Sequence, residues 1–90
     1  MTAAWAPRLG RGARLGFDHV RRVPVVLFPE GVLLLNDTAR AVLEWCDGSR
    51  SIGEIVEGLA ERYTDVREAE VLGLLGELAD RGIVTGAVRG

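Results

Sequence analysis

The sequence predicts an α+β domain in which a three-stranded antiparallel sheet is followed by three helices. Two observations support this prediction. Between positions 14 and 35 the apolar residues alternate with polar ones or run continuously, as in strands, whereas from Asn36 onward they recur every three or four residues, as in helices. Ninety residues with 48% hydrophobic content suffice for one core. We therefore expect a flexible N-terminal arm over residues 1–12 and a single domain over residues 13–90.

Three short segments have the composition of strands. Residues 14–18 alternate apolar and polar side chains, and residues 23–28 (VPVVLF) and 32–35 (VLLL) are continuous apolar runs. Pro29 and Gly31 stand at the second and fourth positions of a type I turn between the last two runs. This order predicts a meander of three antiparallel strands.

Three segments with a helical apolar stripe follow, and each begins at a residue that can cap a helix. The capping residues are Asn36 or Asp37 for the first helix, Ser51 with Glu54 in the capping-box position for the second, and Asp65 for the third. The third helix is expected to end near Gly82. Ile83 and Val84 can add a short extended piece.

Charge and composition disfavour several classes of function. Residues 1–22 carry five arginines and one acid, whereas residues 52–81 carry eight acids and three arginines. A helix that enters a DNA groove should be basic, so a winged-helix DNA-binding regulator is disfavoured and no nucleic-acid partner is expected. No apolar run spans a bilayer and the N-terminus lacks the hydrophobic stretch of a secretory signal, which predicts a cytoplasmic protein without membrane attachment.

The residues that could support catalysis are few. His19 is the single histidine and Cys46 the single cysteine, and neither has an orienting partner motif or metal-ligand spacing. A solvated turn histidine and a packed core thiol are the simpler interpretation, so we expect no catalytic residue, no metal and no cofactor; a thiol-dependent enzyme would need an exposed Cys46. Trp5 and Trp45 are candidate contacts for a partner protein, although a partly buried place at the edge of the core is preferred for Trp45.

The segment from Leu27 to Gly48, LFPEGVLLLNDTARAVLEWCDG, resembles the PqqD family in the order and spacing of its Pro-Glu-Gly turn, Leu-Asn helix start and closing Asp-Gly. The resemblance implies a winged helix-turn-helix-like domain without catalytic activity. It further implies binding of the precursor peptide PqqA and a complex with the radical SAM enzyme PqqE in pyrroloquinoline quinone biosynthesis. A recognition element for another ribosomally made peptide is the alternative. Family members bind the leader as an added strand beside the third strand, packed against the third helix.

The predicted peptide-binding residues lie on these two elements. Val32, Leu33, Leu34 and Leu35 leave the third strand without a polar face, and its open edge suits an added peptide strand. On the third helix, an apolar flank beside the core stripe comprises Leu72, Leu75, Gly76 and Ala79. The same edge could instead be covered by the N-terminal arm or by a second copy, so the chain is expected to be a monomer or a homodimer. Equally, the helix glycines could serve tight packing alone.

Overall fold

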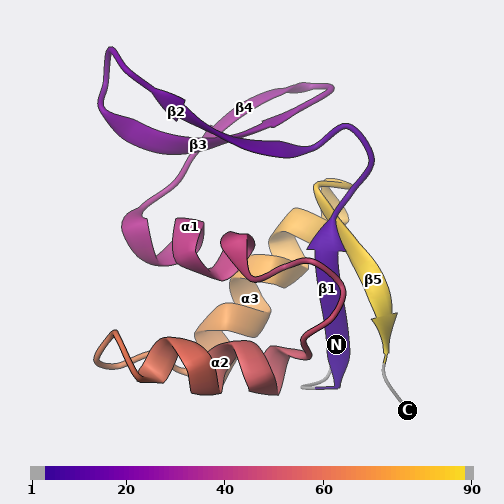
Figure 1. Cartoon of the computed structure of the whole chain (residues 1–90). Coiled ribbons are helices and arrows are strands. Elements are labelled where there is room, and N and C mark those ends of the chain that lie inside the picture. The colour runs from indigo at the N-terminus through magenta and orange to yellow at the C-terminus, as the bar shows by residue number, and fades with distance from the viewer. Residues whose placement is uncertain (1–3, 89–90) are drawn as a thin grey trace.

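The computed structural model describes residues 4–88 (Figure 1). This part of the chain contains three helices and five strands, and the strands form two separate antiparallel sheets. The elements are β1 (Trp5–Leu9), β2 (Arg14–Asp18), β3 (Val23–Phe28), β4 (Gly31–Leu34), α1 (Asp37–Glu44), α2 (Ile52–Ala60), α3 (Glu68–Asp80) and β5 (Val84–Val88). The predicted α+β class is confirmed, and β2, β3 and β4 precede the three helices as predicted, although β1 and β5 add a strand at each end of this order. Because β1 and β5 form a second sheet beside the helices, the description as a winged helix-turn-helix is only approximate.

The predicted meander is the sheet of strand order β2-β3-β4. Phe28 pairs with Gly31, so Pro29 and Glu30 form a two-residue turn where the turn was predicted. Val26 of β3 lies opposite Leu15 of β2 and Leu33 of β4, and it is wholly buried in the core. This face of the sheet therefore covers α1, as Figure 1 shows.

The first two helices begin as predicted. The Asn36 side-chain oxygen accepts a hydrogen bond from the Ala39 N–H at 2.7 Å, and Ser51 and Glu54 form a reciprocal capping box. The predicted start of the third helix at Asp65 is wrong. The residue before α3 is Arg67, whose side chain makes no capping hydrogen bond. Asp65 instead has a φ of +60°, so the chain turns there before the helix can begin.

The core lies between the three helices and the inner face of the sheet. Each helix contributes three buried residues: Ala39, Val42 and Leu43 from α1, Ile52, Ile55 and Leu59 from α2, and Val71, Leu75 and Leu78 from α3. None of the helices in the described part of the chain has the length and apolarity needed to cross a membrane.

Strand β1 corrects the prediction of a flexible arm over residues 1–12. Trp5–Leu9 pairs with β5 along its whole length, and Trp5 is only 5% exposed in the core. On its other side the Leu9 N–H donates to the Cys46 carbonyl, and the Gly48 N–H donates to the Pro7 carbonyl at 3.0 Å. The strand is stabilised by these distant partners and has no apolar alternation, which explains why the local sequence pattern missed it. Residues 1–3 of the predicted arm lie outside the described residues.

Candidate functional site

Strand β4 has an unpaired edge. Within residues 4–88 it pairs with β3 on one side and with no strand on the other. The Leu35 N–H donates to the Pro24 carbonyl on β3 at 2.8 Å. Because main-chain groups point to alternate sides along a strand, those of Leu33 also face β3, and those of Val32 and Leu34 face away from it. We call the main-chain groups of Val32 and Leu34 the free edge of β4.

The side chains of the same segment alternate between two faces of the sheet. Val32 is 58% and Leu34 is 52% exposed, whereas Leu33 packs against the core and Leu35 is buried. Of the four predicted peptide contacts on this strand, two are therefore accessible on the outer side. The opposite edge of the sheet differs, because β2 begins with exposed Arg14 and ends with Asp18. Charges of this kind discourage pairing with another strand.

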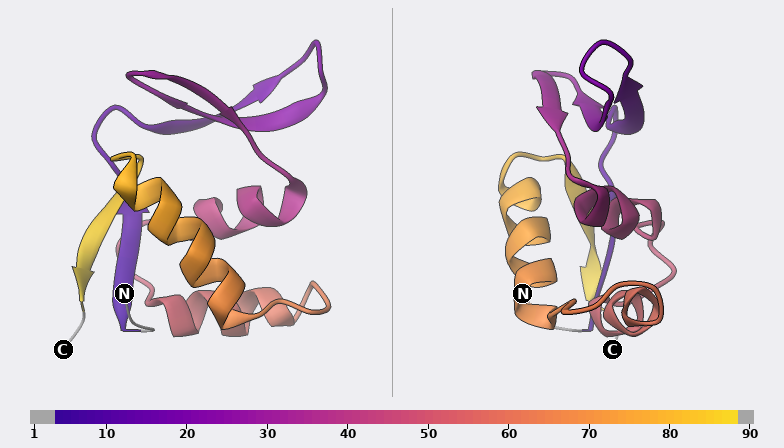
Figure 2. Two further views of the ribbon diagram at one scale, coloured as in Figure 1. Left: turned by 180° about the vertical axis from the view of Figure 1, so that it is seen from behind. Right: turned by 90° about the vertical axis from the view of Figure 1, so that its left-hand side faces the viewer.

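The predicted contacts on α3 have unequal access to solvent. Leu75 is wholly buried in the core and presents no surface to a ligand. Leu72 and Ala79 are half-buried and pack against the core, and Gly76 is also half-buried. In the right-hand view of Figure 2, β4 and α3 lie on the same side of the molecule, with α3 below the sheet. The structure thus brings the two predicted elements to one side.

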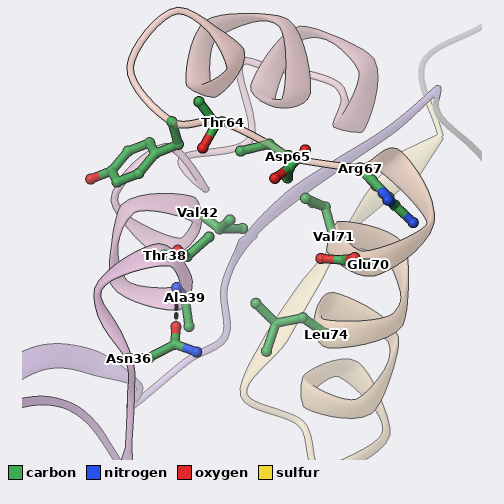
Figure 3. Close-up of a pocket in the computed structure, with 12 residues that line it drawn as sticks. Asn36, Thr38, Ala39, Val42, Thr64, Asp65, Arg67, Glu70, Val71 and Leu74 are labelled. Atoms are coloured by element: carbon green, nitrogen blue, oxygen red, sulfur yellow. Dashed lines mark hydrogen bonds between the residues drawn. The ribbon is translucent and has the colours of Figure 1, made fainter.

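A pocket of about 380 Å³ lies between α1, α3 and the loop that joins α2 to α3 (Figure 3). Val42, Val71 and Leu74 contribute apolar side chains to it, and Arg67 and Glu70 lie at its α3 side. Its full lining is Asn36, Thr38, Ala39, Val42, Tyr63, Thr64, Asp65, Val66, Arg67, Glu70, Val71 and Leu74. Asn36 follows β4 after a single residue, so the pocket begins where this strand ends.

Sequence reasoning missed the pocket and placed the predicted contacts on another flank of α3. Leu74 and Glu70 lie on the side of the helix opposite to Leu72, Gly76 and Ala79, as their spacing from Val71 requires. The available signal was Leu74 itself, which repeats the apolar character of Val71 three residues later. The sequence pattern cannot show that a pocket remains between α1 and this flank of α3.

Cys46 and His19, the two residues considered for catalysis, lie in different parts of the molecule. Cys46 is buried, its thiol donates to the Val42 carbonyl at 3.2 Å, and burial, with a smaller contribution from the Asp47 charge, raises its pKa to about 12. The thiol is consequently protonated near neutral pH and is a poor nucleophile. His19 lies exposed in the β2–β3 turn, where its ring contacts that of Phe17 edge-on with centroids 5.0 Å apart.

The two tryptophans are structural in this fold. Trp45 is half-buried at the edge of the core, as preferred from the sequence, and its ring lies so close to Gly58 of α2 that a Cβ there would overlap it. The Arg50 guanidinium lies 4.6 Å from the centroid of the Trp45 ring, within range of a cation–π interaction. Trp5, considered as a partner contact, is instead buried within the core.

Comparison with known proteins relates this geometry to a family. The model for the family described as coenzyme PQQ synthesis protein D (PqqD) matches residues 25–84. The chain is 44% identical over 84 residues to a PqqA binding protein of Rhodopseudomonas palustris (strain HaA2), covering 90% of this chain and 82% of that protein. It is 41% identical over 90 residues to the PqqA binding protein of Bradyrhizobium diazoefficiens, covering 97% and 87% respectively.

Two solved structures are similar to this fold. The solution NMR structure of the PqqD truncation of Methylobacterium extorquens PqqCD, described as a functional and stand-alone RiPP recognition element, has a TM-score of 0.80 at 37% identity and covers 94% of both chains. The heterocyclase TruD has a TM-score of 0.63 at 18% identity, covers 90% of this chain and 11% of that chain, and shares the fold alone. On the family match, the two close relatives and the shared fold, the chain belongs to the PqqD family of coenzyme PQQ synthesis proteins.

Proposed function

We propose that this protein binds the precursor peptide PqqA as a strand added to the free edge of β4 and presents it to the radical SAM enzyme PqqE in pyrroloquinoline quinone biosynthesis. The observation that carries the proposal is the unpaired edge itself, which exposes main-chain donors and acceptors beside two exposed aliphatic side chains. Relatives named PqqA binding proteins and a neighbour described as a RiPP recognition element support the identity of the cargo. Binding without catalysis is the role that these names describe.

Strand addition accounts for both affinity and selectivity. The main-chain groups of Val32 and Leu34 would bond to the peptide backbone irrespective of its sequence, while its alternate side chains would reach the α3 side of the molecule. Ordering a disordered peptide costs conformational entropy, so the complex should dissociate readily enough to release the substrate.

On α3 we place the peptide along the flank that carries Leu74. The pocket on this flank is lined by Asn36, close to the end of β4, and offers Val42 and Leu74 to an apolar side chain of the peptide. A peptide antiparallel to β4 would bring the residues that precede its paired segment to this pocket. The flank with Leu72, Gly76 and Ala79, expected from the sequence, is the alternative position.

The test of strand addition uses proline at the edge. Leu34→Pro removes an N–H of the free edge without removing a hydrogen bond to β3, a position that edge strands tolerate. We expect calorimetric titration with synthetic PqqA to show binding at least about tenfold weaker than for the native chain. Leu34→Gln keeps the N–H and is the control. Equal binding by the proline and glutamine variants would contradict strand addition at this edge.

A matched pair of leucines tests the position on α3. Leu74→Ala should weaken PqqA binding several-fold, because it removes apolar surface from the pocket, whereas Leu72→Ala should leave affinity unchanged. Both leucines are half-buried in the same helix, so their effects on stability should be similar. The reverse result would place the peptide on the flank with Leu72, Gly76 and Ala79.

A further inference from the structure

The second face of the β2-β3-β4 sheet points away from the helices. In the strand register, Val25 lies opposite Leu34 and Gly16, and Leu27 lies opposite Val32. Val25 and Leu27 are the neighbours of the core residue Val26 along β3. Side chains alternate between faces, so these residues share the side turned away from α1. We call this surface the outer face; its aliphatic residues are Val23, Val25, Leu27, Val32 and Leu34.

The outer face is apolar, and no helix or strand of residues 4–88 covers it. The sheet is the outermost layer in Figure 1, with no element of residues 4–88 above it. Val32 and Leu34 are more than half exposed on it. Val25 is buried, although it lies outside the core cluster, and a Cβ on Gly16 would lie 3.5 Å from its side chain and 3.3 Å from that of Leu27. These side chains therefore form a small apolar layer of their own, packed on one another.

The charge around the outer face differs from that of the rest of the molecule. Residues 10–35 contain four arginines and two acids, whereas residues 37–80 contain eleven acids and four arginines. Asp18, one of the two acids, is already paired with Arg21 at 2.9 Å. Arg14 is exposed and shares the outer face with Leu27, its cross-strand partner. An apolar centre beside a basic margin complements a protein surface that has an apolar centre and a margin of carboxylates.

We propose that the outer face docks a folded protein of that kind, and that this partner is the enzyme that modifies the bound peptide; the identity of the partner rests on the function proposed above. Neither the pocket beside Leu74 nor a second pocket, between β1, β5 and residues 47–49, includes a residue of the outer face. The face thus suits a broad protein surface rather than the insertion of one side chain.

A second copy of the chain fits this face poorly. A two-fold dimer that joined two outer faces would not provide either copy with a margin of carboxylates to complement its exposed arginines. A head-to-tail contact between the outer face and the acidic helices of the next copy would build a ring or a filament of many copies, which sedimentation would detect. Charge complementarity therefore disfavours a two-fold dimer through this face, and a different protein with an acidic margin fits it without building a larger assembly.

Docking at the outer face couples the enzyme to the peptide. A strand added at the free edge of β4 extends the same sheet, and every second side chain of the peptide joins the outer face. The enzyme then contacts the protein and the peptide together. Peptide should raise the affinity for the enzyme, and by thermodynamic reciprocity the enzyme should raise the affinity for the peptide by the same factor.

The experiment measures binding of PqqE to the full chain, with and without saturating PqqA, by biolayer interferometry at two salt concentrations. Arg14→Glu reverses a charge on the outer face at the edge remote from β4 and should weaken PqqE binding about tenfold, with an unchanged affinity for PqqA. Arg62→Glu, the same change at an exposed arginine in the α2–α3 loop, should leave PqqE binding unaltered. Higher salt should weaken the native interaction and narrow the difference between native and Arg14→Glu.

Three results would overturn the inference. The first is PqqE binding that Arg14→Glu leaves unchanged while PqqA still binds, and the second is a larger effect from Arg62→Glu. The third is a native dimer, seen by sedimentation, that Arg14→Glu dissociates, because the outer face would then join two copies. A failure of the native chain to bind PqqA would instead contradict the proposed function, so the two failures are distinguishable.

Discussion

Strand β1 of one sheet and strand β4 of the other differ in how their outer edges are paired. Strand β1 has β5 on one side and main-chain hydrogen bonds to Cys46 and Gly48 on the other, so the sheet near the chain ends is closed at β1. Strand β4 has β3 on one side and no strand on the other within residues 4–88. The contrast indicates that the β1–β5 sheet stabilises the fold, while the β2-β3-β4 sheet retains an edge that can accept a ligand.

Removal of the indole of Trp5 should give the largest loss of stability. Trp5 lies at the start of β1 and is buried among core residues, so Trp5→Ala should lower the free energy of unfolding by about 3–5 kcal/mol. Chemical denaturation measures this change. Val20→Ala, at a side chain that is 93% exposed in the β2–β3 turn, should change stability by less than about 0.5 kcal/mol. Similar values for the two variants would mean that β1 is not part of the folded core.

Two glycines should respond to the same substitution with opposite sign. Gly86 of β5 has a φ of +142° and lies against the Ala6 carbonyl of β1, so Gly86→Ala should destabilise the protein by about 2 kcal/mol. Gly73 of α3 has open space around the position of a Cβ, and Gly73→Ala should stabilise by up to about 1 kcal/mol. Thermal denaturation of the pair tests whether the β1–β5 contact is as close as the structure places it; a stabilising Gly86→Ala would show that it is not.

Alkaline pH should lower the free energy of unfolding through the thiol of Cys46. The pKa of its thiol is raised by burial from 9.0 to about 12, so the unfolded chain releases this proton at lower pH than the folded chain. The contribution to stability is complete below pH 9 and is lost as pH rises from 9 to 12, at up to about 1.4 kcal/mol per pH unit. Urea denaturation at several pH values measures the slope. Cys46→Ala should reduce it, and an unchanged slope would contradict a buried, protonated thiol.

The smallest predicted effect concerns the turn of the open sheet. The Arg21 backbone N–H, and then its guanidinium, bond to the Asp18 carboxylate and lower its pKa below 3.8. Any stability from this contact is present above pH 3.8 and is lost as pH falls through the lower, folded pKa. NMR titration of the Asp18 carboxyl carbon should show the depressed midpoint. In Arg21→Gln the midpoint should move partway back, because the backbone donor remains; no movement would exclude a contribution from the guanidinium.

The comparison between the two sheets also explains what could be predicted from the sequence. The β2-β3-β4 meander and the first two helix caps follow from local patterns, because alternation, the Pro29–Glu30 turn and the Ser51–Glu54 box act over a few residues. Strand β1 could not be predicted in this way, since its partners are β5 and the loop after α1. Among the site residues, the exposed Val32 and Leu34 lie on the predicted strand. The burial of Leu75 and the pocket beside Leu74 depend instead on how the helices and the loop between α2 and α3 are arranged in space.

The central claim, that the free edge of β4 receives the peptide, is tested most directly by amide hydrogen exchange measured residue by residue with NMR. In the free protein the Leu33 and Leu35 amides, which face β3, should exchange slowly, and those of Val32 and Leu34 should exchange fast. Saturating PqqA should slow Val32 and Leu34 at least about tenfold and leave the edge strand β2 unchanged. Unaltered exchange at Val32 and Leu34 with the peptide bound, or new protection along β5 instead, would contradict the claim.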